Sequence, residues 1–180
     1  IRWGGAFLIV LPFSWRYLVQ DWPVIRRHFG VMVLISIAGI GAFNTLQYFA
    51  LERTNALNIL LLQSSGPLFV AIWSLMLLGI RLTLKQALGL CVSLLGVLAI
   101  LLKGDFGALA AIRFNGGDLL FILALAIFGF YSVMALKRPP IHSMSFLAFT
   151  FGCGAVVQIP LVVWEMKVRP LMQIDLPNLL

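Results

Sequence analysis

The sequence predicts an all-α protein, built as a polytopic transmembrane helix bundle of about six spans. Composition gives the first reason: 62% of the residues are hydrophobic and 11% are charged, whereas about a quarter of an ordinary soluble domain is charged. The second reason is that the charged residues separate long uncharged runs. The third is the length and even apolarity of these runs, which exclude the alternating strands of about ten residues that build a membrane β-barrel.

The uncharged runs place the helices, because every backbone amide inside lipid must be hydrogen-bonded and a helix achieves this within one segment. The predicted helices cover residues 3–19, 31–51, 55–79, 86–103, 118–137 and 144–165. The first run is short, and it reaches a spanning length because Arg16 can extend its side chain to the headgroups. The second and third runs match or exceed the roughly 20 apolar residues that cross a hydrocarbon core. They are therefore predicted to span the bilayer.

The fourth and fifth predicted helices flank the longest interruption of the apolar pattern. This interruption, residues 104–117, is rich in glycine and predicts an extramembrane loop between a first domain, 1–103, and a second domain, 118–180. The sixth helix is followed by a tail too polar to span. Because the chain begins with Ile1 rather than Met and the second domain holds only two helices, we expect further helices on both sides of this segment.

The basic residues indicate the ends of membrane spans. The net charge is +7, and the Lys and Arg residues occur singly or in pairs between apolar runs. This pattern favours a lipid bilayer as partner over nucleic acid, which requires a continuous basic stripe. Basic residues cluster most closely in the short loops around Arg26, Arg81 and Lys137. We expect these loops in the cytoplasm.

Motifs of catalysis and metal binding are absent from the sequence, which contains no phosphate loop, no HExxH pattern and no Cys/His metal spacing. His28 and His142 lie in loops without a neighbouring acid or nucleophile, and Cys91 and Cys153 lie inside apolar runs. We therefore expect no catalytic residues, no cofactor and no metal site. The protein is predicted not to be an enzyme.

Polar side chains inside the apolar runs are the candidate functional residues, because they are costly in lipid unless they face the bundle interior or a wet cavity. They share helix faces in the second, third and fifth predicted helices. The candidates are Asn44, Gln47, Tyr48, Asn58, Gln63, Ser65, Trp73, Phe128, Tyr131 and Ser132. Together they predict a cavity for a small zwitterionic or amphipathic solute, although hydrogen bonds between packed helices would explain the same residues. Pro67 predicts either a hinge or a static kink.

Several of these runs carry a family resemblance. The segment Phe43–Leu51 (FNTLQYFAL), Pro67 in the next span, the loop Leu78–Gly89 (LGIRLTLKQALG) and the run Gly117–Leu120 (GDLL) resemble the EamA-type drug/metabolite transporters. The resemblance extends over nearly the whole chain. One position departs from the pattern: the family usually has Glu before the Arg of the loop Leu78–Gly89, where this chain has Ile80 before Arg81.

The resemblance implies a fold and a function. Members have ten spans in two inverted five-helix repeats, and this chain matches the second to the seventh, so that residues 1–103 resemble a first repeat without its first span and residues 118–180 resemble the start of the second. It implies a multi-pass protein of the bacterial inner membrane that is a secondary transporter of a small metabolite or drug-like solute by alternating access. A homodimer is a separate expectation. The alternative is a non-transport protein, either a scaffold or a lipid-modifying enzyme.

Overall fold

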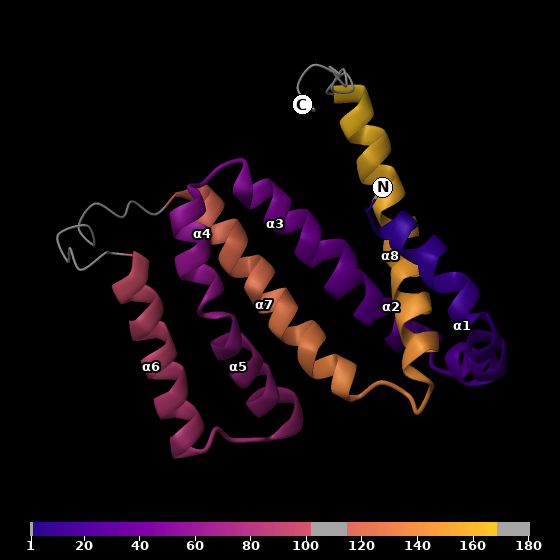
Figure 1. The fold of residues 1–180 in the computed structure, drawn as a ribbon, viewed down its shortest axis with the longest axis horizontal. Coiled ribbons are helices and arrows are strands. Elements are labelled where there is room, and N and C mark those ends of the chain that lie inside the picture. The colour runs from indigo at the N-terminus through magenta and orange to yellow at the C-terminus, as the bar shows by residue number, and fades with distance from the viewer. Residues whose placement is uncertain (1, 102–114, 169–180) are drawn as a thin grey trace.

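The computed structural model describes residues 2–101 and 115–168, and it confirms the all-α fold class, with no strand among these residues (Figure 1). The expected loop 104–117 falls mostly outside the described residues, as does the polar tail. The helical elements in chain order are α1 (Arg2–Arg27), α2 (Phe29–Ser36), η1 (Ile37–Ala42), α3 (Phe43–Leu51), α4 (Ala56–Gln63), α5 (Gly66–Leu78), α6 (Leu84–Leu101), α7 (Gly116–Leu136) and α8 (Ser143–Val168).

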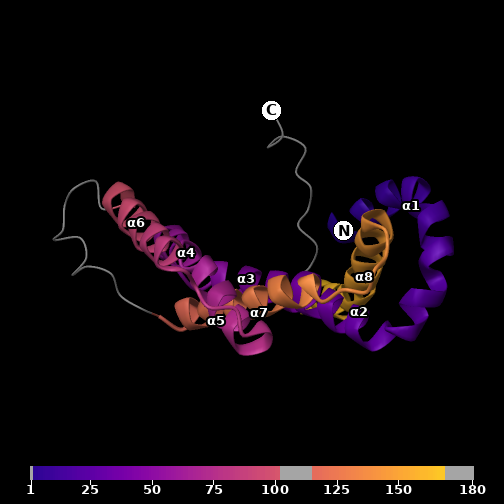
Figure 2. The ribbon, with the colours of Figure 1, turned by 90° about the horizontal axis from the view of Figure 1, so that it is seen from below.

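Helix α1 is longer than predicted and curves around α8 (Figure 2). Two prolines lie inside it, and the buried Ser14 hydroxyl donates to the carbonyl of Val10 at 2.9 Å, a bond that bends helices. The helix continues past residue 19 because Asp21 accepts hydrogen bonds from the backbone N–H of His142 at 2.8 Å and from the hydroxyl of Ser145 at 2.6 Å. Contacts with α8 thus stabilise the polar end of α1.

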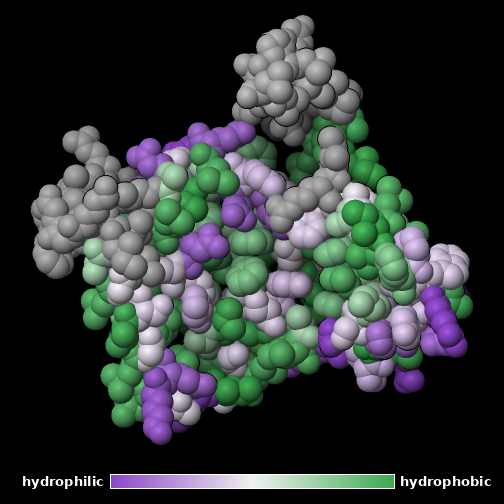
Figure 3. Space-filling model, in the orientation of Figure 1, coloured by the Kyte–Doolittle hydropathy of each residue, from purple (hydrophilic) through white to green (hydrophobic). Residues whose placement is uncertain are grey.

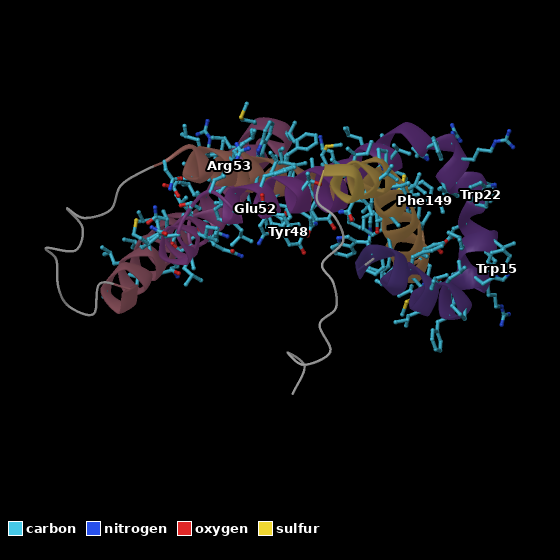
Figure 4. The ribbon with its side chains drawn as sticks, turned by 90° about the horizontal axis from the view of Figure 1, so that it is seen from above. Trp15, Trp22, Tyr48, Glu52, Arg53 and Phe149 are labelled. Atoms are coloured by element: carbon cyan, nitrogen blue, oxygen red, sulfur yellow. The ribbon has the colours of Figure 1, made fainter. Side chains whose placement is uncertain are left out.

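The outer side of α1 carries large aromatic residues. Trp15 and Trp22 lie along its outer edge, away from α8, and are 59% and 47% exposed (Figure 4). Tryptophan is enriched where a membrane protein meets the headgroups, which suits a helix at the border of the bundle.

The second span is one continuous helical rod made of α2, η1 and α3. Its central part, η1, is a π-helix, in which each backbone bond reaches one residue further than in an α-helix. Gly39 and Gly41 lie in this part, and both are buried. A Cβ at Gly39 would lie 2.5 Å from the Tyr131 ring, so glycine is what allows α7 to approach here.

The third span is interrupted where Pro67 predicted a bend. α4 ends at Gln63 and α5 begins at Gly66, with Pro67 in the first turn, where the missing N–H has no helical partner to lose. The hydroxyls of Ser64 and Ser65 donate to the carbonyls of the turn before, at 2.6 and 2.5 Å. They satisfy backbone groups that the interruption would otherwise leave unpaired.

Four described segments are long and apolar enough to cross a membrane: Phe29–Leu51, Asn58–Leu78, Gly116–Leu136 and Ser143–Val163. In Figure 3, green hydrophobic residues cover much of the visible face, and the most hydrophilic residues gather near its upper edge, its lower left and its right side. The turns after α1, α5 and α7, which carry the clustered basic residues, lie along one edge of the molecule (Figure 1). This common edge agrees with the alternation expected for successive spans.

Helix α7 is the central element, and it packs closely against its neighbours. A Cβ at Gly129 would lie 2.8 Å from the backbone carbon of Phe69, so α5 and α7 touch backbone to backbone. On the other side, Tyr131 covers η1, and α8 approaches η1 through Gly154, whose added Cβ would meet Ile40 at 2.2 Å. Small residues therefore hold α5, α7, α8 and η1 around a common centre.

Candidate solute cavity

A cavity of about 660 Å³ opens where α1, η1, α3, α4, α5, α7 and α8 meet. Both irregular spans border it: η1 contributes Gly39 and Ile40, and the interruption between α4 and α5 contributes Gln63 and Pro67. The described residues that line it are all uncharged at neutral pH. The cavity thus combines an apolar wall with a few polar groups, as small-molecule sites do.

Six of the candidates from the sequence line this cavity: Asn44, Gln47, Gln63, Pro67, Phe128 and Tyr131. They come from α3, α4, α5 and α7, so segments far apart in the sequence converge. The structure also adds lining residues that sequence reasoning missed, namely Trp3, Phe43, Phe146, Thr150 and Phe151. Aromatic and threonine side chains in an apolar run carry no signal that separates a cavity wall from a packed interface.

Three candidates lie outside the cavity lining for local reasons. Tyr48 is 54% exposed, because it follows Gln47 by one residue and so points about 100° further around α3. The hydroxyl of Ser132 donates to the carbonyl of Phe128 at 2.8 Å within its own helix. Ser65 serves the interruption of the third span, where its hydroxyl binds a backbone carbonyl.

Asn58 and Trp73 face α7 instead of the cavity. The Asn58 amide donates to Oδ2 of Asp118 at 3.0 Å. The Trp73 indole donates to the carbonyl of Ala126 at 2.8 Å, and its ring packs edge-on against Phe130 with centroids 5.1 Å apart. Both side chains join the third span to α7, which is a packing role.

Asp118, the first residue of the predicted helix 118–137, is a fully buried carboxylate. The Thr54 hydroxyl, just before α4, and the Asn58 amide of α4 donate to it, and the backbone N–H of Asn115 donates at 2.8 Å. Asn115 in turn accepts from the N–H groups of Gly117 and Asp118, which completes a capping box. The spacing Asn-x-x-Asp was the signal that could have identified this cap.

Asn44 is held by the π-helix. Its side chain is 7% exposed, and Nδ2 donates to the carbonyls of Gly39 at 3.2 Å and Ile40 at 3.1 Å. The Gln158 amide of α8 donates to the same Ile40 carbonyl at 3.1 Å. Both amides satisfy carbonyls where the helical pattern changes, so only the Asn44 oxygen remains available to a bound molecule. Sequence reasoning missed Gln158. An amide inside an apolar helix is costly in lipid, and this could have marked Gln158 as a residue that faces the bundle interior.

Gln47 and Gln63 differ from Asn44 in having no hydrogen-bond partner in the part of the chain that the structure describes. Among the described residues neither amide makes a hydrogen bond, and both line the cavity. Gln47 lies one turn after Asn44 on α3, and Gln63 is the last residue of α4. Their donors and acceptors are therefore free to meet water or a solute.

Aromatic rings form two parts of the cavity wall. Phe43 and Phe128 have centroids 5.0 Å apart, and Phe128 and Tyr131 have centroids 6.3 Å apart. A second pair, Trp3 of α1 and Phe151 of α8, has centroids 5.2 Å apart. The described residues contain no group of three or more His, Cys, Asp or Glu side chains that could hold a metal ion.

A bundle of apolar helices around an uncharged cavity beside two irregular spans agrees with the class of membrane transport proteins, whose substrate sites lie at broken helices. The chain belongs to the EamA-like transporter family, whose family pattern matches residues 1–102. It is 26% identical to the "Uncharacterized transporter YyaM" of Bacillus subtilis (strain 168) over 144 residues, which is 79% of this chain and 47% of that protein. The chain thus spans about half the length of this relative. No solved structure matches the chain. These matches confirm a multi-pass protein of the cell membrane.

Proposed function

We propose that the protein is a secondary transporter that moves a small metabolite or drug-like solute by alternating access around this cavity. The carrying observation is that two spans are irregular beside the same cavity, one as a π-helix at Ile37–Ala42 and one as the interruption after Gln63. In transporters, substrate sites lie at such broken helices, because the interruption frees backbone and side-chain groups for the solute. The solute would be held by Asn44, Gln47 and Gln63.

Pro67 would be the hinge in this mechanism. It lies in the first turn of α5 beside the cavity, and the backbone N–H groups of Ser65 and Leu68 donate to carbonyls three residues before them, as in a tight turn. A rotation of α5 at this point would change the opening of the cavity without breaking the hydrogen bonds of either helix. A static kink would leave the cavity open to one side only.

Access from both sides is the property that distinguishes a transporter from a scaffold or a lipid-modifying enzyme. In the full-length protein in native membrane vesicles, with Cys91 and Cys153 replaced by Ala, a single Gln47→Cys change is labelled with a membrane-impermeant maleimide. We expect labelling from either face, in right-side-out and in inverted vesicles. Leu60→Cys is the matched control, because Leu60 of α4 is 56% exposed on the bundle exterior and does not line the cavity.

Alternating access also predicts that a change favouring one conformation increases labelling from one side of the membrane and decreases it from the other. A Pro67→Ala change allows a straighter third span, and it should shift the ratio of labelling from the two faces at Gln47→Cys. Labelling from neither face, or from one face in every variant, would contradict the proposal.

A further inference from the structure

We propose that the cavity selects a planar heterocycle through a cyclic-amide edge, meaning an N–H next to a ring carbonyl. This inference rests on the proposed function and adds the chemical class of the solute. It follows from two features of the cavity: amide side chains that make no hydrogen bond to a described residue, and aromatic side chains that present flat surfaces.

The amides supply the hydrogen-bonding pattern. Gln47 and Gln63 each carry a donor and an acceptor side by side, and neither is used by another described residue. An amide side chain pairs in two bonds with a partner that offers a complementary donor and acceptor, as Asn and Gln do with the edge of a base. Asn44 adds only an acceptor, because its amino group binds the carbonyls of Gly39 and Ile40.

The aromatic residues supply the surface for a ring. Phe43, Phe128 and Tyr131 form one group on α3 and α7, and Trp3 and Phe151 form another on α1 and α8. Flat ligands stack on such side chains, and the stacking tolerates different ring substituents because every ring has a π-face. A ring with a cyclic-amide edge would therefore use both features at once.

Charge and size agree with this class. The described lining residues are uncharged, so a neutral ring loses less hydration free energy on entering the cavity than an ion does. The volume of about 660 Å³ lies within the range of about 300–1,000 Å³ found for sites of drug-sized ligands. A pyrimidine or purine ring with one further substituent would fit such a space.

Uridine is a suitable probe, because its ring places N3–H between two carbonyls, and 3-methyluridine is the matched ligand in which a methyl group blocks that N–H. Binding of labelled uridine to the purified full-length protein in nanodiscs is measured by scintillation proximity, with inosine as a second ring of the same edge. We expect 3-methyluridine to compete at least about tenfold more weakly than uridine, because a blocked edge leaves the site's amides unpaired.

Variants of the two glutamines test whether the cavity recognises the cyclic-amide edge of the ligand. Gln47→Leu and Gln63→Leu should each reduce the preference for uridine over 3-methyluridine, while Leu60→Ala, outside the cavity, should keep it. Equal competition by the two nucleosides, or a preference that survives in both Gln variants, would overturn the inference. If neither uridine nor inosine binds to protein whose Gln47→Cys form is labelled from both faces, the ligand class is wrong and alternating access stands. Edge-selective binding with labelling from one face only would reject alternating access and keep the ligand class.

Discussion

Helix α7 passes two polar clusters that differ in whether their hydrogen-bonding groups have partners. At its start, the buried Asp118 receives bonds from Thr54, Asn58 and the backbone of Asn115. Further along, α7 borders the cavity, where Gln47 and Gln63 have no partner among the described residues. Polar residues in an apolar helix occur in both clusters. Satisfied groups join helices, whereas unsatisfied groups facing a cavity are available to a solute.

The strongest way to break the first cluster is to remove the carboxylate. Asp118→Ala removes the acceptor of three donors: the Thr54 hydroxyl, the Asn58 amide and the backbone N–H of Asn115. We expect a loss of about 3 kcal/mol or more in folding free energy. Thermal unfolding of purified protein and its abundance in the membrane measure this loss. Asp118→Asn is the matched control, since its remaining oxygen still accepts from Asn115. Equal abundance of Asp118→Ala and the parent would show that the cluster does not hold the third span.

The next effect concerns the position of α7 itself, on which both clusters depend. Gly129→Ala places a Cβ 2.8 Å from the backbone of Phe69, so that α5 or α7 must shift. Overpacking of this kind costs about 1–3 kcal/mol, and we expect a lower unfolding temperature. Gly89→Ala on α6 is the control, because an added Cβ there meets nothing within 4 Å among the described residues. The same decrease in both variants would contradict the close approach.

A smaller effect is expected at the π-helix. Gln158→Leu removes one of the two amides that donate to the Ile40 carbonyl, and Asn44 keeps the other bond. A loss of about 1 kcal/mol is the typical effect of one hydrogen bond. Hydrogen exchange measured by mass spectrometry should show faster exchange in peptides that contain Ile37–Ala42, with unchanged exchange in α6. Unchanged exchange in η1 would mean that Gln158 does not stabilise it.

The helices themselves were predictable because charged residues bound each apolar run, and most observed ends lie close to the predicted ones. α1 was the exception: its extension to Arg27 depends on bonds that Asp21 accepts from His142 and Ser145, at the start of α8 and far away in the sequence. The π-helix was also not predicted, because its backbone pattern depends on amide side chains from two helices. The bonds to Asp21 and the bond from Gln158 to Ile40 join residues 118 to 124 positions apart, and such contacts leave no trace in local periodicity.

The candidate site was predicted in part, and the reason lies in the third span. A continuous helix would place Asn58, Ser65 and Trp73 on one face. Asn58 and Trp73 do face the same way, but toward α7, and Ser65 lies in the turn between α4 and α5. Gln63 follows Asn58 by five residues and so points about 140° further around α4, which is why it lines the cavity while Asn58 contacts α7. On α3, which is regular, Asn44 and Gln47 share the expected face.

The central claim is that the cavity amides of Gln47 and Gln63 bind a solute, whereas the Asn58 amide, which bonds to Asp118 of α7, stabilises the fold. Thermal unfolding of the full-length protein with Gln47→Leu or Asn58→Leu tests this most directly, because both changes replace one amide by a similar apolar side chain. Asn58→Leu removes a donor from a buried carboxylate, so we expect a loss of about 1.5–3 kcal/mol. Each kcal/mol lowers the unfolding temperature by about 2–4 °C in a protein of about 150–250 residues. Gln47→Leu should leave the unfolding temperature unchanged or slightly higher, since it removes an amide without a described partner. A similar decrease in both variants would contradict the account.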